Sequence, residues 1–188
     1  MWVAAASDHN RVTDVTETAD IETIRARAKE ANVNEQTLLA TDYLNHFNEA
    51  LMLLELVPDM PECLDDLASW EPIGYEEHFR RSSLSGRALV IDAYAHSPAE
   101  YREPFDEVIC RLGDLVQAAI ACAGTMIARG NTEAADRIIG RAMPAIRELQ
   151  EAAAAIINGA HVSFNRGEIV ESADTTLNQA EIDQLLGR

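Results

Sequence analysis

The chain has 188 residues, of which 47% are apolar and 25% are charged, so it is long and apolar enough to form one folded domain. Its 32 acidic residues outnumber its 15 basic residues and give a net charge of −17, which repels nucleic acids and anionic membrane surfaces. It has no run of about 18 apolar residues, no basic start of a secretory signal and no metal-type pair among its cysteines. We therefore expect a reduced, cytoplasmic protein with neither a nucleic acid nor a membrane as its partner.

The composition also predicts the fold class. Alanine is abundant, aromatic residues make up only 5% of the chain, and no stretch alternates apolar and polar residues as a strand would. The sequence therefore predicts an all-α protein. We expect a helical bundle domain over residues 17–159 that is built around a long antiparallel helical hairpin.

The amino-terminal part of the chain is polar. Residues 1–16 are rich in Thr and Asp, which predicts a disordered terminus. Residues 17–31 predict a short, charged helix whose apolar stripe consists of Ile21, Ile24 and Ala28.

A longer helix is predicted over residues 35–57, with Asn34 as its cap. Apolar residues three and four apart mark its buried side: Leu44, Phe47, Leu51 and Leu54. Pro58 ends it, because the residue before a proline is pushed out of the helical conformation. The region that follows predicts two helical turns over 60–69, a loop with short helical turns over 69–86, and a short helix over 86–96.

The strongest pattern covers residues 98–158. Ser97, Pro98 and Glu100 combine a cap, a first-turn proline and a capping-box acid at its start. Apolar residues then follow heptad spacing: Phe105, Val108, Leu112, Leu115, Ala119, Cys122 and Met126. This spacing predicts a long helix with one buried side.

The sequence predicts a second long helix directly after the first. Gly130 ends the first helix, and Asn131 or Thr132 caps the second. Its apolar positions again follow heptad spacing: Ile138, Ala142, Ala145, Leu149, Ala152 and Ile156. The two helices form the hairpin, to which the 35–57 helix adds a third long element. The fourth wall of the bundle is the 86–96 segment, the 17–31 helix or a second subunit, and we expect a homodimer.

After Gly159 the helical pattern is lost. Residues 160–176 predict a flexible linker, and residues 177–188, LNQAEIDQLLGR, predict a short amphipathic helix. A helix of about two turns is not stable alone in water. We therefore interpret residues 177–188 as a docking peptide that folds on a partner, with packing on its own bundle as the alternative.

The string LNQAEIDQLL at residues 177–186 resembles the peptide by which chemotaxis proteins bind CheY-like response regulators. Similar strings occur at the amino terminus of the flagellar switch family FliM and at the carboxyl terminus of the phosphatase family CheZ. In the CheZ family the peptide follows a helical hairpin and a flexible linker, which is the order expected here. The resemblance implies that the regulator is bound by Gln179, Glu181, Ile182, Asp183, Leu185 and Leu186. The aliphatic side chains would fill an apolar groove, and the acids would meet its basic rim.

This resemblance implies a chemotaxis-type signalling regulator that binds a CheY-like response regulator, and it raises the question of whether the chain also dephosphorylates it. The CheZ family places an Asp and a Gln four residues apart on a hairpin helix, and this hairpin has no Asp-x-x-x-Gln string. Two acid–amide pairs three residues apart are the catalytic alternatives: Asp114 with Gln117, and Asp42 with Asn45. No cofactor is expected, because a magnesium ion would belong to the regulator.

A polar stripe on the predicted 35–57 helix offers a different kind of site. Asp42, His46 and Glu49 lie at i, i+4 and i+7 and so share a face with ligand-like spacing. Three residues of the 69–86 region could join them: Glu76, Glu77 and His78. No Glu-x-x-His pair of a di-iron bundle is present, and no metal is expected. The alternatives to signalling are a bundle that binds a metal or small ligand on this stripe, and a non-catalytic structural dimer.

Overall fold

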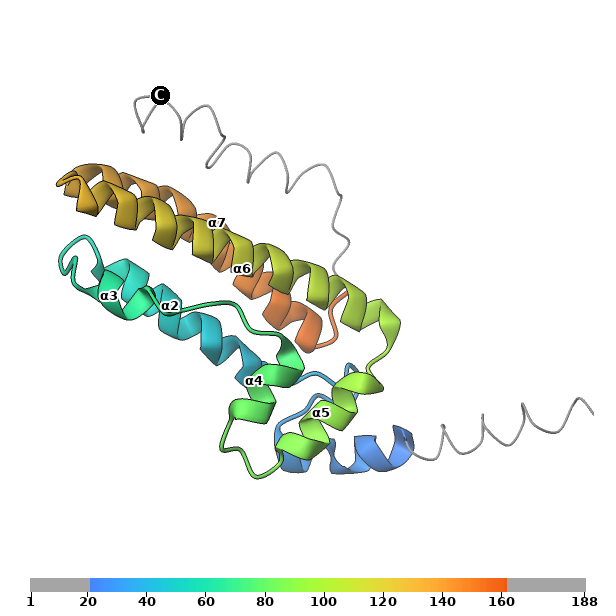
Figure 1. The fold of residues 1–188 in the computed structure, drawn as a ribbon. Coiled ribbons are helices and arrows are strands. Elements are labelled where there is room, and N and C mark those ends of the chain that lie inside the picture. The colour runs from blue at the N-terminus through green and yellow to red at the C-terminus, as the bar shows by residue number, and fades with distance from the viewer. Residues whose placement is uncertain (1–20, 162–188) are drawn as a thin grey trace, which may run out of the picture.

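The computed structural model describes residues 21–161, and Figure 1 shows that part of the chain as helices joined by loops. In chain order the elements are a helix over 21–28, the 3₁₀-helices η1 (Lys29–Ala31) and η2 (Thr41–Leu44), and the α-helices α2 (Asn45–Leu56), α3 (Cys63–Leu67), α4 (Tyr75–Arg81), α5 (Arg87–Ala95), α6 (Ala99–Ala128) and α7 (Thr132–Ile157). Among these residues the only extended pairing is an isolated antiparallel bridge between Val33 and Ala40. The all-α prediction is confirmed.

The α6–α7 hairpin forms the long axis of the molecule, and its turn uses the residues that the sequence indicates (Figure 1). Gly130 has a φ of 75°, a left-handed conformation that glycine adopts at no steric cost after a helix. The side chain of Asn131 then accepts a hydrogen bond of 3.1 Å from the backbone N–H of Ala134 and caps α7.

The buried side of the hairpin is turned slightly from the heptad prediction. In α6, Leu115 and Cys122 are only half-buried, and their neighbours Val116 and Ala123 are fully buried. The same one-residue shift occurs twice in α7, where two predicted positions are half-buried and the next residue is buried: Ala145 before Ile146, and Ala152 before Ala153. A straight α-helix with 3.6 residues per turn drifts relative to a seven-residue repeat, which explains the shift.

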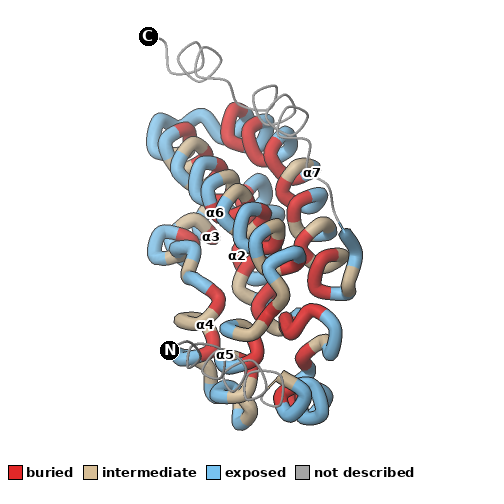
Figure 2. Tube along the Cα trace, turned by 90° about the vertical axis from the view of Figure 1, so that its right-hand side faces the viewer, coloured by how far each residue is buried: buried red, intermediate tan, exposed pale blue. Residues whose placement is uncertain are grey.

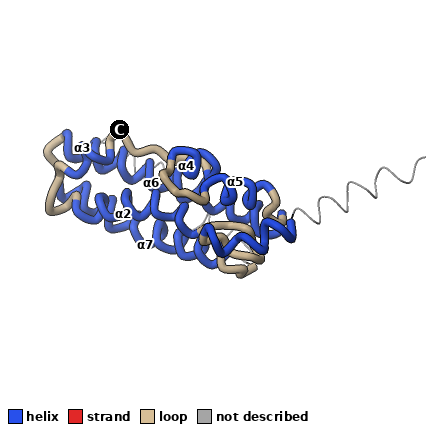
Figure 3. Tube along the Cα trace, turned by 90° about the horizontal axis from the view of Figure 1, so that it is seen from below, coloured by secondary structure: helices blue, strands red, loops and turns tan. Residues whose placement is uncertain are grey.

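The third long helix, α2, lies against both hairpin helices and buries Phe47, Ala50, Leu51 and Leu54. Figure 2 shows buried stretches recurring along α6 and α7. The short α3 packs against α2 and α6, whereas α5 contacts α4 and η1. Figure 3 places α3 towards one end of the molecule and α5 towards the other. Neither α5 nor the 21–28 helix therefore supplies a fourth long wall within the described residues.

The predicted helix over 35–57 is wrong in its first part, because residues 33–40 form a compact loop. Asn34 does accept hydrogen bonds through its side chain, from the backbone N–H groups of Gln36 at 2.9 Å and Thr37 at 3.0 Å. However, Leu38 has a φ of 58°, which interrupts any helix. The reason is burial: the run Leu38, Leu39 and Ala40 is fully buried, and an isolated surface helix cannot bury three consecutive residues on one stripe.

Ser97 does not cap α6 as predicted. The cap position of α6 is Pro98, and it makes no side-chain capping bond. Instead the buried Ser97 hydroxyl donates a 2.7 Å hydrogen bond to the carbonyl of Thr37. The buried Thr37 hydroxyl in turn donates a 2.7 Å hydrogen bond to the carbonyl of Ile157, at the end of α7. The two hydroxyls join the 33–40 loop to the start of α6 and the end of α7.

Three sequence predictions lie outside the described residues: the disordered terminus 1–16, most of the linker 160–176, and the docking peptide 177–188.

The apolar character of α6 is stronger than the sequence analysis expects. By length and composition alone, α6 is apolar enough to cross a membrane. Buried residues follow one side of α6 from Tyr101 to Met126, a pattern typical of the central helix of a bundle.

We predict that Thr37→Val destabilises the fold. Valine keeps the size of the side chain but leaves the Ile157 carbonyl without its buried donor, which costs about 1–3 kcal/mol of the free energy of unfolding. Thr37→Ser keeps the hydroxyl and is the matched variant, with a smaller loss expected. Urea denaturation of the three proteins measures the difference, and an unchanged midpoint for Thr37→Val would contradict this role.

Candidate functional site

A polar groove of about 420 Å³ lies between the start of α2 and the second half of α7. Its lining is made of residues from η2 and α2 on one side and from α7 on the other: Thr41, Asp42, Leu44, Asn45, Asn48, Arg147, Gln150, Glu151 and Ala154. Both members of the Asp42–Asn45 pair are among them. We call this feature the α2–α7 groove.

The local backbone brings Asp42 and Asn45 together. Residues Thr41–Leu44 form a 3₁₀-helix, and the backbone N–H of Asn45 donates to the carbonyls of Asp42 and Tyr43. A 3₁₀-helix has three residues per turn, so side chains three apart lie one above the other. The acid and the amide are therefore more closely aligned than they would be on the α-helix that the sequence predicts.

Buried aromatic residues hold η2 in place. The Tyr43 hydroxyl donates a 2.7 Å hydrogen bond to the carbonyl of Ile73, and the Ala40 backbone N–H donates at 2.7 Å to the Tyr75 hydroxyl. The rings of Tyr43 and Tyr75 lie 5.1 Å apart. Burial raises the pKa of both phenols, so both hydroxyls stay protonated and keep their hydrogen-bonding roles at neutral pH.

The α7 wall of the groove is linked to α2 by polar side chains. Arg147 forms an ion pair with Glu55 of α2. The Gln150 amide donates a hydrogen bond to the Asn48 side-chain oxygen. The Asn48 amide donates to the Asn45 side-chain oxygen at 3.2 Å. The groove thus combines two acids, Asp42 and Glu151, with one arginine and three side-chain amides that are linked by hydrogen bonds.

The second acid–amide pair, Asp114 and Gln117, is not brought together in the wall of the cavity that Asp114 lines. Asp114 lines a different, more apolar cavity of about 280 Å³ between the 72–75 loop, α5 and α6, and Gln117 is not part of its wall. There the Tyr94 hydroxyl donates a 2.7 Å hydrogen bond to Asp106. Burial raises the pKa of the Asp106 carboxyl, which this hydrogen bond partly offsets.

The residues of the proposed ligand stripe, Asp42, His46 and Glu49, have different contacts in the structure. Asp42 lines the α2–α7 groove, whereas His46 Nε2 lies 2.8 Å from the carbonyl oxygen of Glu71. Both acids still act on the histidines, because Glu49 favours protonation of His46 and Asp42 favours protonation of His78. The His46 ring stacks on Trp70 with centroids 5.0 Å apart. Within residues 21–161 no group of three or more His, Cys, Asp or Glu side chains is arranged to hold a metal ion.

Of the three suggested partners of this stripe, only His78 approaches it. The rings of His46 and His78 lie 6.0 Å apart, at the contact of α2 with α4. Glu76 and Glu77 instead pair with arginines on their own helix, Arg80 and Arg81. Burial lowers the pKa of both histidines, and the proximity of His46 lowers that of His78 further.

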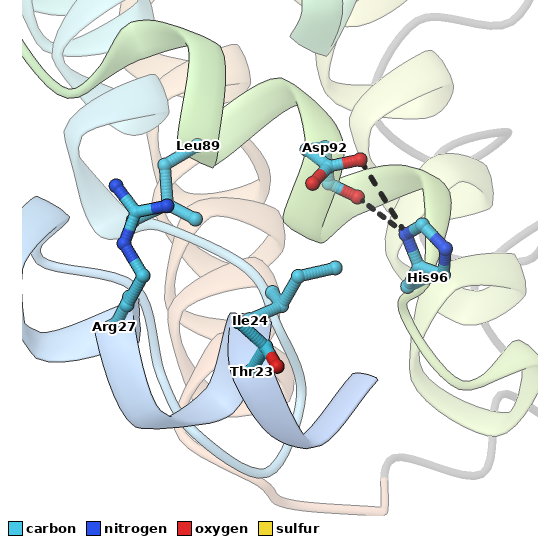
Figure 4. A pocket seen from close by; sticks show the side chains of 6 residues that line it. All are labelled: Thr23, Ile24, Arg27, Leu89, Asp92 and His96. Atoms are coloured by element: carbon cyan, nitrogen blue, oxygen red, sulfur yellow. Dashed lines mark hydrogen bonds and ion pairs between the residues drawn. The ribbon is translucent and has the colours of Figure 1, made fainter. Parts of the chain in front are cut away.

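A third cavity, of about 320 Å³, lies between the 21–28 helix and α5 (Figure 4). Thr23, Ile24, Arg27, Leu89, Asp92 and His96 line it. His96 Nδ1 lies 2.9 Å from the Asp92 carbonyl oxygen, on the same helix. Its residues come from separate helices with no shared motif, and no pattern in the sequence indicates it.

The α7 side of the groove is not predicted from the sequence. Asp42 and Asn45 are predicted as a pair, but Arg147 and Gln150 lie about 100 residues later. Their only local signal is the polar side of an amphipathic helix, which does not indicate what that side faces.

We predict that the histidine pair makes stability depend on pH. The folded protein holds both imidazole pKa values below 6.5, so the unfolded chain binds protons first as the pH falls. The contribution of the neutral histidine pair to the free energy of unfolding is complete above pH 6.5. It is lost as the pH falls through 6.5 towards the pKa values of the folded protein. In a His46→Gln/His78→Gln double variant, the unfolding midpoint should change less between pH 7 and pH 5 than in the wild-type protein, and His9→Gln is the control. The same change of midpoint with pH in all three proteins would contradict this.

No family model, curated protein or solved structure matches this chain.

Proposed function

We propose that this protein is a signalling regulator that binds a CheY-like response regulator through residues 177–188 and promotes its dephosphorylation at the α2–α7 groove. The observation that carries the second part is that Asp42 and Asn45, three residues apart at the 3₁₀ turn, both line one open groove. The first part rests on the resemblance of the carboxyl-terminal string. In the described part of the chain, Gln117 does not line the cavity that holds Asp114, which favours Asp42 and Asn45 as the working pair.

The chemistry is hydrolysis of an aspartyl phosphate. A water oxygen attacks the phosphorus, the bond from phosphorus to the aspartyl oxygen breaks, and inorganic phosphate and a free carboxylate result. In this scheme the Asn45 amide orients the water in line with the breaking bond, and the Asp42 carboxylate pairs with the active-site lysine of the regulator. The protein thereby contributes position and charge, which provide most of the catalysis in phosphoryl transfer. Any magnesium ion is held by the regulator.

The end of α7 lies beside the groove, which supports a role for the tail in delivery. The Ile157 carbonyl accepts its hydrogen bond from Thr37, only four residues before Thr41 of the groove. If residues 160–176 form the flexible linker that the sequence predicts, they span about 23 Å on average. A regulator bound by residues 177–188 would then be held at high effective concentration near Asp42 and Asn45.

The net charge of −17 fits this arrangement. It speeds association with partners that present basic surfaces, and it disfavours anionic ones. A homodimer and a cytoplasmic location remain predictions of the same proposal. The charge-free stretch of α6 over residues 115–128, where Ala118 and Ala121 are exposed, is the part of the hairpin that a second copy could cover with least repulsion.

We predict that removal of residues 177–188 abolishes binding of the regulator and leaves the melting temperature almost unchanged. The Leu185→Ala/Leu186→Ala variant should weaken binding about 10²-fold, because two buried leucine side chains are lost. Calorimetry with phosphorylated and unphosphorylated regulators measures both effects. A large fall in melting temperature on truncation would instead show that the peptide packs on its own bundle.

We predict that Asn45→Ala slows phosphate release from the phosphorylated regulator about 10²-fold, and that Asp42→Ala has an effect of similar size. Asp114→Ala and Gln117→Ala are the matched pair and should retain the wild-type rate. Loss of activity only in the α6 variants would move the site to that helix. If the wild-type protein does not speed release at all, only the binding role survives.

A further inference from the structure

A chain of three side-chain amides runs from α7 to Asn45. Gln150, half-buried on α7, donates to the Asn48 oxygen, and Asn48 donates to the Asn45 oxygen at 3.2 Å. Asn48 lies one turn after Asn45 on α2, so the chain bridges two helices that are about 100 residues apart in sequence. Every link points the same way, with the amide nitrogen donating towards Asn45.

These two hydrogen bonds couple the orientation of the Asn45 amide to that of Gln150. A side-chain amide has an oxygen that accepts through two lone pairs and a nitrogen that donates two hydrogens. If Asn45 alone were flipped, its nitrogen would face the nitrogen of Asn48, and two donors would oppose each other, so Asn45 keeps its orientation as long as Gln150 and Asn48 keep theirs. In the observed arrangement one lone pair of Asn45 Oδ1 is used by Asn48. The second lone pair and the two N–H groups of Nδ2 remain for groups in the groove.

We propose that Gln150 is a positioning residue, which acts through Asn48 to set the Asn45 amide for hydrolysis. With Asn45 held in this way, Oδ1 accepts from one hydrogen of the attacking water, and Nδ2 donates to a phosphoryl oxygen, where negative charge is spread in the transition state. This inference rests on the proposed function and adds a residue of α7 to its site.

Because the hydrogen bonds between the three amides all run in one direction, the proposal can be tested with variants of nearly equal shape. In Gln150→Glu the side chain keeps its length, but a carboxylate cannot donate to the Asn48 oxygen. Asn48 then turns its nitrogen towards residue 150 and its oxygen towards Asn45, which reverses Asn45. Gln150→Ala removes the link without reversing it. Ala88→Glu, on the exposed side of α5, adds the same charge away from the groove and is the control.

The experiment measures kcat and KM for phosphate release from a phosphorylated CheY-like regulator, together with the melting temperature of each variant. We expect Gln150→Glu to lower kcat about tenfold or more, Gln150→Ala to lower it less, and Ala88→Glu to leave it unchanged. KM and the melting temperature should stay at the wild-type values in all three, because the regulator is held by the tail.

The outcomes separate this inference from the function on which it rests. If Asn45→Ala slows release as predicted and Gln150→Glu does not alter kcat, the positioning role is overturned and the proposed function stands. A change in KM or melting temperature in place of kcat assigns Gln150 a structural role and also overturns the inference. If Asn45→Ala has no effect, the proposed function fails first, and the positioning role fails with it.

Discussion

Two buried hydroxyl groups determine where the polar groove of this protein lies. Thr37 donates to the last turn of α7, and Ser97 donates to the Thr37 carbonyl from the start of α6, so the 33–40 loop is tied to both helices at the open end of the hairpin. Helix ends leave carbonyl groups without intrahelical partners, and Thr37 satisfies one of them in the interior. Because this loop leads directly into η2, the position of Asp42 against α7 follows from these bonds.

The groove combines a rigid frame with a locally unusual backbone. Hydrogen bonds of the buried Tyr43 and Tyr75 hydroxyls hold η2 against the core. The 3₁₀ geometry of η2 places Asp42 and Asn45 one turn apart on the same side. The opposite wall belongs to α7, whose amide at Gln150 reaches across to α2. Side chains held from several elements keep a fixed geometry better than those on a single mobile loop, which is what a water-positioning site requires.

Local patterns predicted much of the fold, and long-range packing decided the rest. The hairpin, its turn at Gly130 and Asn131, and the short helix that became α5 follow from spacing and capping residues. The loop at Leu38 does not, because its left-handed φ is stabilised by burial between distant segments. For the site, the sequence indicated Asp42, Asn45 and the polar stripe. It could not show that His46 turns to Trp70 while Asp42 turns to α7, since both lie on one side of an ideal helix.

The proposed function requires that the α2–α7 groove receives the phosphorylated face of a response regulator. It is tested most directly by titrating the ¹⁵N-labelled full-length protein with a CheY-like receiver domain held in its active state by beryllofluoride, while the side-chain amide signals are followed by NMR. We expect the signals of Asn45, Asn48 and Gln150 to shift together with those of the carboxyl-terminal peptide. Shifts confined to the peptide, or centred on Gln117 of α6, would contradict it.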